Sequence, residues 1–258
     1  MQRTENHSNI LVERLDSVDS TNLHARRLIE SDKFGDQPRV FVASEQTGGV
    51  GRFGRSWASP IGGLWMTIAW PTTSAVSEIL DGLGLRAGLA LLHSIDHTLS
   101  AHGHDSDVRI KWPNDILIKG RKVAGVLCET LSHGATTHIL VGAGVNGNFP
   151  VRALPPELRK TATTLSDEIG AKVNLDRLLD DLIVRFAEAL TTQGITEHRV
   201  AEIERRLFGA GEPASVTLPD RSKLTGTLLG LTSDGRLRVR ADGGEITLPS
   251  GAELALER

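Results

Sequence analysis

The chain is short of cysteine, of long apolar runs and of any large charge excess. Cys128 is its single cysteine, which excludes an internal disulfide framework and suits the reducing cytoplasm, where we expect the protein to work. No apolar run approaches the roughly 20 residues of a membrane-spanning helix, and the first residues lack the apolar core of a signal peptide. The chain has 29 basic and 32 acidic residues, so it lacks the positive charge excess that is typical of general nucleic-acid binding.

Length and composition indicate a globular protein with one large domain and an appendage. The chain has 258 residues, of which 39% are apolar and 24% are charged. Strand-like and helix-like segments alternate from residue 10 to about residue 145. After a linker at residues 209–213, short alternating runs separated by Pro-Asp, Ser-Asp-Gly and Asp-Gly-Gly turns predict a small β-barrel or sandwich. We therefore expect two domains, residues 1–210 and residues 211–258.

The spacing of apolar residues predicts the individual elements of the larger domain. Strands are expected at residues 10–15, 39–44, 63–70 and 138–142, and a hairpin is expected from residues 116–118 and 123–131. Helices are expected at residues 20–31, 79–100, 174–192 and 197–207, with Asp19 or Ser20 as the cap of the first and Asn174 as the cap of the third.

Residues 111–115, Lys-Trp-Pro-Asn-Asp, form the most informative short segment. They follow a strand-like run, and Pro113 biases Trp112 away from helix, so the strand should stop there. A cation at a strand end, beside a polar turn, suits an anionic small molecule. The alternative is that Lys111 is an ordinary exposed lysine, which is the commoner fate of this residue type.

The segment at residues 46–57 holds four glycines and two arginines, Arg52 and Arg55. Glycines allow the backbone to approach a ligand and to direct its N–H groups toward it, and arginines supply forked donors for phosphate or carboxylate. The loop could therefore wrap a phosphate-bearing ligand. It matches neither the Walker nor the Rossmann pattern. The alternative is a mobile surface loop with solvated arginines.

Several other candidates have ordinary structural explanations. Residues 19–22, Asp-Ser-Thr-Asn, are most simply a helix cap, and Asn146 could merely occupy a left-handed turn. Cys128 lies in an apolar run and should be an inert core thiol. The four tryptophans are expected in the core. The nine histidines show no metal-ligand spacing and are expected to be structural or exposed.

Taken together, these motifs resemble those of the biotin protein ligases, in order and in spacing. The motifs are Asp-Ser-Thr-Asn, the glycine and arginine loop that ends in Trp57, Lys-Trp-Pro-Asn-Asp, Lys-Val-Ala-Gly-Val-Leu-Cys-Glu and Gly-Ala-Gly-Val-Asn. The resemblance implies an α/β (α+β) catalytic domain with a mixed sheet, followed by a small SH3-like β-barrel. It also implies that ATP and Mg²⁺ convert biotin to biotinyl-5′-adenylate. Biotin would then pass to a lysine of the biotin carboxyl-carrier domain of a biotin-dependent carboxylase.

The same resemblance assigns roles to residues at the matching positions. Lys111 and Arg52 would be catalytic and would contact both substrates. Biotin would be bound by Ser20, Thr21, Asn22, Gln46, Val50, Gly51, Gly125 and Gly142, together with Arg52 and Lys111. ATP would be bound by Arg55, Trp57, Asn114, Lys122 and Asn146, together with Arg52 and Lys111. Asp115 is a candidate base for the transfer step, and no metal ligands are assigned.

The sequence departs from the family pattern at two places. Val50 replaces the first arginine of the usual Gly-Arg-Gly-Arg, which should weaken the hold on biotin or on the adenylate. About ten residues precede the first strand, so we expect a ligase, monomeric or homodimeric, without a DNA-binding domain and without DNA as a partner. Every named motif lies before residue 150, so the C-terminal domain is not expected to supply the biotin pocket. Two rival functions remain, a lipoate–protein ligase and a non-catalytic biotin-binding or regulatory module.

Overall fold

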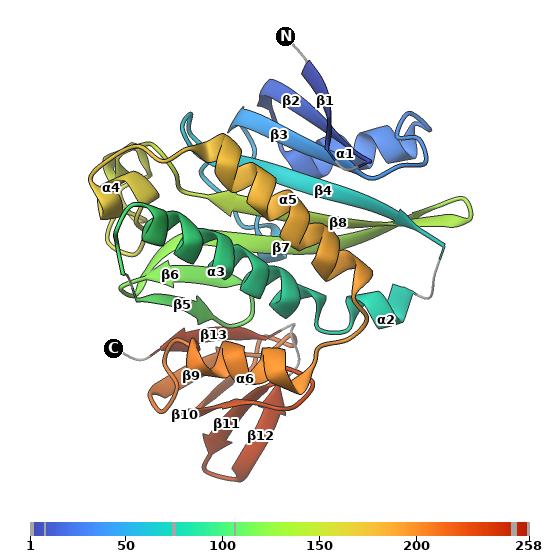
Figure 1. The fold of residues 1–258 in the computed structure, drawn as a ribbon. Coiled ribbons are helices and arrows are strands. Elements are labelled where there is room, and N and C mark those ends of the chain that lie inside the picture. Colours follow the sequence, from blue (N-terminus) through green and yellow to red (C-terminus); the bar gives the residue numbers. More distant parts are fainter. Residues whose placement is uncertain (1–2, 8, 74–75, 106, 249–251, 257–258) are drawn as a thin grey trace.

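The computed structural model describes residues 3–7, 9–73, 76–105, 107–248 and 252–256. An eight-stranded sheet forms its larger part, in the order β1-β2-β3-β4-β8-β7-β6-β5 (Figure 1). The strands are β1 (Arg3–His7), β2 (Ile10–Val18), β3 (Arg39–Gln46), β4 (Leu64–Thr72), β5 (Val108–Lys111), β6 (Asp115–Ile118), β7 (Arg121–His133) and β8 (Thr136–Val145). Only β2 and β3 are parallel among these neighbours, so the sheet is mixed, as expected.

Helices cover both faces of this sheet. The long helices α3 (Leu83–Ala101) and α5 (Leu175–Thr191) lie side by side across one face (Figure 1). Helix α1 (Thr21–Glu30) packs on the other face, because Phe41 of β3 joins its apolar cluster while the neighbouring Val40 and Val42 join the cluster of α3 and α5. Successive strand residues point to opposite faces, so this alternation separates the two layers.

The predicted amphipathic helix at residues 174–192 is confirmed as α5. The Asn174 side chain accepts a hydrogen bond from the Arg177 N–H at 3.0 Å and so caps the first turn. One face of the helix is buried, through Leu178, Leu179, Leu182, Ile183, Phe186, Ala189 and Leu190. Among the described residues, no helix is long and apolar enough to cross a membrane.

The prediction of one helix at residues 79–100 is wrong at its start. Helix α2 (Val76–Leu80) and α3 are separate, because Gly82 takes a left-handed conformation between them with φ of 65°. A Cβ atom at this position would lie 2.8 Å from Cβ of Ile195, so glycine also permits close packing here. The hairpin of β6 and β7 is confirmed, with Lys119 and Gly120 at positive φ in its turn.

The C-terminal part is a five-stranded antiparallel sheet, in the order β12-β11-β10-β9-β13. Its strands are β9 (Pro213–Thr217), β10 (Lys223–Leu231), β11 (Leu237–Ala241), β12 (Gly244–Leu248) and β13 (Glu253–Leu256). Helix α6 (Glu197–Arg205) leads into it, and the short helix α4 (Leu165–Ile169) precedes α5. Apolar residues of both sheets belong to one buried cluster, so this module is packed against the larger part of the molecule.

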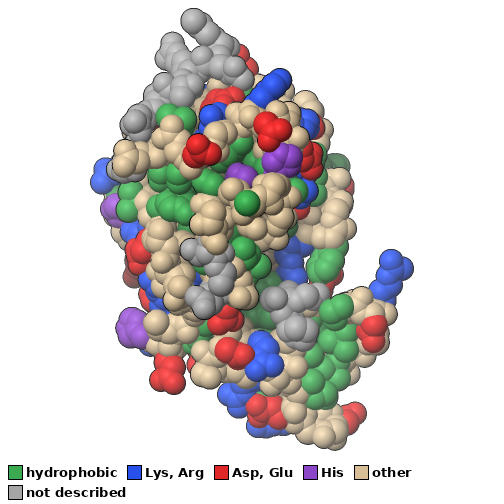
Figure 2. Space-filling view, turned by 90° about the vertical axis from the view of Figure 1, so that its right-hand side faces the viewer, with side chains coloured by type: hydrophobic (Ala, Val, Ile, Leu, Met, Phe, Trp, Pro, Cys, Tyr) green, Lys and Arg blue, Asp and Glu red, His purple; other side chains and the backbone are tan. Residues whose placement is uncertain are grey.

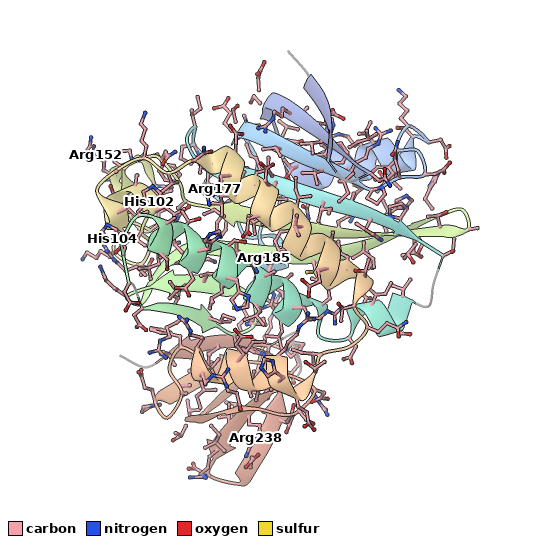
Figure 3. The ribbon with its side chains drawn as sticks, viewed as in Figure 1. His102, His104, Arg152, Arg177, Arg185 and Arg238 are labelled. Carbon is pink, nitrogen blue, oxygen red and sulfur yellow. The ribbon has the colours of Figure 1, made fainter. Side chains whose placement is uncertain are left out.

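Charges are distributed over the surface without a dominant sign. Figure 2 shows acidic and basic side chains interspersed on the face in view. Figure 3 places His102 and His104 together at one end of α3, while Arg185 projects from α5. Among the described residues, no group of three or more histidine, cysteine, aspartate or glutamate residues could hold a metal ion.

Candidate functional site

A cavity of about 320 Å³ opens on the α1 face of the large sheet. All fifteen residues to which the sequence assigned a binding or catalytic role line it: Ser20, Thr21, Asn22, Gln46, Val50, Gly51, Arg52, Arg55, Trp57, Lys111, Asn114, Lys122, Gly125, Gly142 and Asn146. They come from the first turn of α1, the glycine loop (residues 46–57), the turn between β5 and β6, and the strands β7 and β8. The structure therefore brings the separate motifs to one place, and their individual roles stay predictions.

Strand register explains how motifs far apart in sequence reach the same cavity. Lys111 pairs with Asp115, Asp115 with Gly125, and Gly125 with Gly144, so these four residues form one row across the sheet. Residues paired directly across neighbouring strands lie on the same face. The row thus carries a lysine and a carboxylate at one end and two residues without side chains at the other, which leaves room for the Trp57 ring above the strands.

The end of the cavity near α1 is polar and uncharged. The Thr21 backbone N–H donates to Oε1 of Gln46 at 2.8 Å, and the Gln46 amide nitrogen donates to Oγ of Ser59 at 2.8 Å. Asn22 Nδ2 donates to the Glu129 carboxylate at 2.7 Å. These bonds fix the orientation of both amides, so the cavity presents a prearranged set of donors and acceptors.

Residues 19–22 do form the start of a helix, as expected, but the expected side-chain cap is not made. Ser20 stands at the N-cap position of α1, but its side chain makes no capping hydrogen bond. The Asp19 carboxylate instead accepts two bonds from Arg27, at 2.7 and 2.8 Å, and one from the Ser20 N–H at 2.8 Å. The helix start is therefore held by Asp19 and Arg27, and Ser20, Thr21 and Asn22 are left to line the cavity.

The pair of Asp19 and Arg27 gives a pH-dependent prediction. The Arg27 hydrogen bonds lower the pKa of Asp19 to about 2, from about 3.9 in an unfolded chain. A depressed carboxylate pKa adds stability above the unfolded pKa, and this stability is lost as the pH falls through the folded pKa. Because the pair is exposed, we expect Asp19→Asn to lower the free energy of unfolding by less than about 1 kcal/mol at pH 7. Urea unfolding should show this difference vanishing between about pH 4 and pH 2, and a difference independent of pH would contradict it.

The middle of the cavity is cationic. Lys111, Arg52, Arg55 and Lys122 line it together with two carboxylates, Asp115 and Glu253. Lys122 Nζ lies 2.7 Å from Asp115 Oδ1, and Arg55 pairs with Glu253. Lys111 forms no ion pair with any residue that the structure describes. Burial lowers the pKa of Lys111, Asp115 raises it, and Lys122 and Arg55 lower it further. A desolvated ammonium among other cations is stabilised by an incoming anion.

The glycine loop is anchored at both ends, which argues against the interpretation as a mobile surface loop. The Gly48 N–H donates to Asp19 O at 2.8 Å, and the Trp57 N–H donates to Gly49 O at 2.8 Å. Arg52 Nη1 donates to Asn114 Oδ1 at 3.2 Å, so the loop is tied to the turn that follows Lys111. Burial lowers the pKa of Arg52, and Asp115 and Glu253 oppose this shift. The loop thereby places one desolvated guanidinium in the same cavity as Lys111.

Trp57 lies flat over the two glycines of the row at the other end of the cavity. A Cβ atom at Gly144 would lie 2.6 Å from the indole Nε1, and one at Gly125 would lie 3.4 Å from the ring. Lys122 Nζ lies 4.7 Å from the ring centroid. Trp65 and Trp112 are buried in the core as expected, whereas Trp57 and Trp70 are only half-buried. An indole beside a cation offers an aromatic surface to a planar ligand.

Two parts of the cavity wall were missed by the sequence analysis. Leu154, Leu158, Thr161 and Ala162 line it from the segment before α4, and Glu253 and Leu254 line it from β13. The expectation that the C-terminal module does not supply the biotin pocket itself stays a prediction, but the module does contribute to the cavity wall. The same module is tied to the large sheet by Trp112, whose indole N–H donates to Gly235 O at 3.2 Å. No local motif marks these residues, because their position depends on packing between distant segments.

The expected character of Cys128 is supported by its environment. Burial raises the pKa of the Cys128 thiol to about 12, so almost no reactive thiolate exists at neutral pH. The residue packs against the main apolar cluster and does not line the cavity.

Comparison with known proteins agrees with this geometry. A model of the biotin/lipoate A/B protein ligase family matches residues 15–146, just over half of the chain. The chain belongs to this family. A model of the biotin protein ligase C-terminal domain matches residues 210–253, which cover most of the second sheet.

Similar proteins within the biotin protein ligase family span several bacteria. A biotin–[acetyl-CoA-carboxylase] ligase of Paracoccus denitrificans is 31% identical over 246 residues, which cover 90% of this chain and 95% of that protein. A bifunctional ligase/repressor of Bacillus spizizenii is 32% identical over 173 residues, which cover 66% of this chain. The chain spans about half the length of that relative, 51%. A biotin protein ligase of Aquifex aeolicus, solved with biotin and ATP, has a TM-score of 0.78 at 28% identity and covers 97% of this chain and 100% of its own.

Proposed function

We propose that the protein is an ATP-dependent biotin protein ligase. It forms biotinyl-5′-adenylate and transfers biotin to a lysine of a biotin carboxyl-carrier domain, in the cytoplasm that its single cysteine suits. The observation that carries the proposal is the order in which three chemically different parts follow one another along the cavity. A fixed polar end, a cationic middle and an aromatic end follow one another, which matches the ureido ring, the carboxylate with the phosphates, and the base of the two substrates.

The polar end receives biotin. Thr21, Asn22 and Gln46 present oriented donors and acceptors to the ureido group, and the missing side chain of Gly142 lets Asn22 pack directly against β8. A Cβ atom at Gly142 would lie 2.3 Å from Oδ1 of Asn22, so the strand has no space for a larger residue there. Gly125, on the neighbouring strand, lets the Trp57 ring lie close to β7.

The cationic middle lowers the barrier to adenylation. Biotin's carboxylate is already ionised at neutral pH, so it attacks the α-phosphorus of ATP without a base, and pyrophosphate leaves. The main obstacle is repulsion between two anions. Lys111 and Arg52, both partly desolvated, stabilise the negative charge that gathers as they meet. Mg²⁺ would be held chiefly by the phosphates and would neutralise their charge, because the two carboxylates of the cavity, Asp115 and Glu253, are paired with Lys122 and Arg55.

The aromatic end receives the nucleotide base. Trp57 offers its ring, and Lys122 lies above the same ring. Asn146 Nδ2 donates to Thr163 O at 2.9 Å and so ties the end of β8 to the wall of the cavity. In the transfer step an uncharged lysine amine of the carrier attacks the biotinyl carbonyl, and AMP leaves. Asp115 is the candidate acceptor of the amine proton.

The proposal is tested by offering the protein two acyl substrates. Purified protein, ATP, Mg²⁺ and a carboxyl-carrier domain are incubated with labelled biotin or with labelled lipoate. We expect biotin to be incorporated into the carrier lysine and lipoate not to be. Preferential incorporation of lipoate would identify the other branch of the family, and binding of biotin without any incorporation would identify a non-catalytic module.

Val50 gives a separate prediction about the bound intermediate. The residue lines the cavity with its side chain 39% exposed, at the position where the family usually has arginine. An exposed pair of opposite charges contributes about 0.2–1 kcal/mol, so Val50→Arg should slow dissociation of biotinyl-adenylate by roughly 1.5- to 5-fold. Biotinylation of bystander lysines should decrease accordingly. The dissociation rate of biotinyl-adenylate is measured for the wild type, for Val50→Arg and for the control Val184→Arg, which makes the same substitution at an exposed position of α5. Equal rates in all three proteins would refute the prediction.

A further inference from the structure

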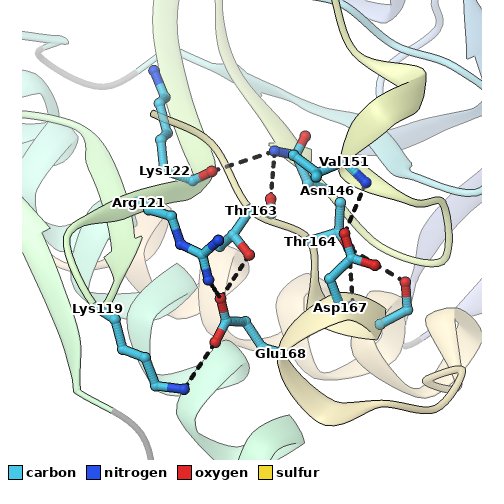
Figure 4. A network of polar contacts seen from close by, with 10 residues as sticks. Lys119, Arg121, Lys122, Asn146, Val151, Thr163, Thr164, Asp167 and Glu168 are labelled. Carbon is cyan, nitrogen blue, oxygen red and sulfur yellow. Dashed lines mark hydrogen bonds and ion pairs between the residues drawn. The ribbon is translucent and has the colours of Figure 1, made fainter. Parts of the chain in front are cut away.

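A buried carboxylate lies outside the cavity and behind its nucleotide end. Glu168 is part of α4, and its side chain is only 2% exposed. The carboxylate accepts a hydrogen bond from Thr163 Oγ1 at 2.6 Å, and it pairs with Lys119 Nζ at 3.1 Å and with Arg121. Figure 4 shows the carboxylate between these three side chains. Glu168 is not among the residues that line the cavity.

The partners of Glu168 belong to two segments that build the cavity. Thr163 ends the wall segment, residues 158–163, from which Leu158, Thr161 and Ala162 line the cavity. Lys119 and Arg121 flank Gly120 in the turn between β6 and β7. Lys119 and Gly120 both have positive φ, 49° and 76°, so this tight turn holds its two cations on either side of the glycine. Glu168 is therefore a bridge between the wall segment and the hairpin.

The wall segment is bonded to the start of β7 next to that bridge. The Lys122 N–H donates to Thr161 O at 2.8 Å, and the Thr163 N–H donates to Lys122 O at 2.9 Å. Asn146 Nδ2 donates to Thr163 O at 2.9 Å and faces Lys122 O at 3.4 Å. Lys122 and Asn146 both line the nucleotide end. Displacement of the wall segment would move the backbone partners of both residues.

We propose that Glu168 is a positioning residue that holds the wall segment against β7 and thereby shapes the nucleotide end of the cavity. This inference rests on the proposed function, since it takes ATP as the ligand of that end. Glu168 does not touch the substrate. It acts through Thr163 and through the hairpin, and its charge neutralises two cations that would otherwise repel each other beside the nucleotide site.

The charge state of Glu168 agrees with this role at neutral pH. Burial raises the pKa of the carboxyl, but the hydrogen bonds from Thr163 and Lys119 and the charge of Arg121 outweigh burial and leave the pKa below its ordinary value. The carboxylate is consequently ionised under the conditions in which the enzyme works. Glu168→Gln removes the charge while nearly preserving the shape, so it separates electrostatic bridging from packing.

The test compares ATP and biotin affinities, measured separately by calorimetry, in three proteins. A misplaced wall should weaken ATP binding by about 10- to 100-fold in Glu168→Gln, while biotin affinity changes by less than about twofold. The matched control is Asp181→Asn. Asp181 is another partly buried carboxylate, which accepts from Ser94 and Arg185 on α3 and α5, away from the cavity. The control should leave both affinities unchanged.

A second readout follows the wall itself. Hydrogen exchange of the Lys122 and Thr163 amides should be faster in Glu168→Gln than in the wild type and the control. If Glu168→Gln does not fold, Lys119→Ala takes its place, because Lys119 is an exposed residue whose loss should change the same quantities in the same direction.

Each outcome decides between defined possibilities. Weakened ATP binding with retained biotin binding supports the positioning role. Unchanged ATP affinity in a folded variant overturns it, and so does an equal loss of both affinities, which would mark a general structural role. If the wild-type protein binds neither biotin nor ATP, the proposed function itself fails, and the exchange measurement still reports whether Glu168 holds the wall segment.

Discussion

Lys111→Ala is expected to lower the rate of biotin- and ATP-dependent pyrophosphate release by about 100- to 1,000-fold. This is the usual effect of removing one preorganised donor that stabilises the charge developing in a transition state. The reason is the environment of the ammonium. Lys111 ends β5 on the cavity side of the sheet, is partly desolvated and forms no ion pair within the described part of the chain. Its charge can therefore interact with the reacting carboxylate and phosphate, because it is not neutralised by an ion pair with a protein carboxylate.

Two further variants make the Lys111 prediction specific. Lys111→Arg keeps the charge but replaces a compact ammonium with a planar fork, so we expect it to recover only part of the lost rate. Lys33→Ala removes a lysine that is exposed and lies outside the cavity, and it should leave the rate unchanged. Near-normal pyrophosphate release by folded Lys111→Ala would show that another cation, such as Arg52, carries the charge stabilisation.

A pair of glycine substitutions on β8 should separate the two substrate sites. Gly142 and Gly144 point to the same face of the strand, two residues apart. Added Cβ atoms would lie 2.3 Å from Asn22 Oδ1 and 2.6 Å from Trp57 Nε1, respectively. Overpacking of this kind costs about 1–3 kcal/mol, and relief of the clash by displacement of Asn22 or Trp57 would transfer up to this cost to binding, at most roughly 5- to 150-fold in affinity. Gly142→Ala should therefore weaken biotin binding, and Gly144→Ala should weaken ATP binding.

The two glycine variants serve as controls for each other. Titration of each variant with biotin and with ATP gives four affinities to compare with those of the wild type. We expect each variant to lose affinity for one ligand and to retain the other within about threefold, since the added methyl groups contact different side chains. If both variants lost both ligands equally, the assignment of the two cavity ends would be refuted.

The larger part of the fold was accessible from the sequence because its signals are local. Alternating apolar residues fixed the central strands, and Asn174 followed by one apolar face predicted α5 with its cap. The break between α2 and α3 was missed, because apolar spacing continues across Gly82 and only its contact with Ile195 requires the left-handed turn. The role of Asp19 was also misjudged, because the partner that satisfies it, Arg27, lies two helical turns further on.

In the candidate site, too, residues in local motifs could be predicted and residues placed by long-range packing could not. Residues in compact motifs, such as Lys111 with Asn114 and the glycine loop, could be assigned to one site from the sequence and its family resemblance, and their individual roles stay predictions. Their convergence depends on strand register, which the pairing of Lys111, Asp115, Gly125 and Gly144 supplies. Glu253 and the wall segment at residues 158–163 have no motif. They reach the cavity through the docking of the C-terminal module and through the contacts of Glu168, which only three-dimensional packing defines.

The central claim is that the cavity joins biotin to AMP before any acceptor is present. Pyrophosphate release measured with purified protein, ATP and Mg²⁺, with and without biotin and without a carrier domain, tests it most directly. We predict release that depends on biotin, reaches about one equivalent per active site, and becomes continuous when the carrier domain is added. Pyrophosphate release that is absent or independent of biotin, from a folded protein that binds both ligands, would contradict the account.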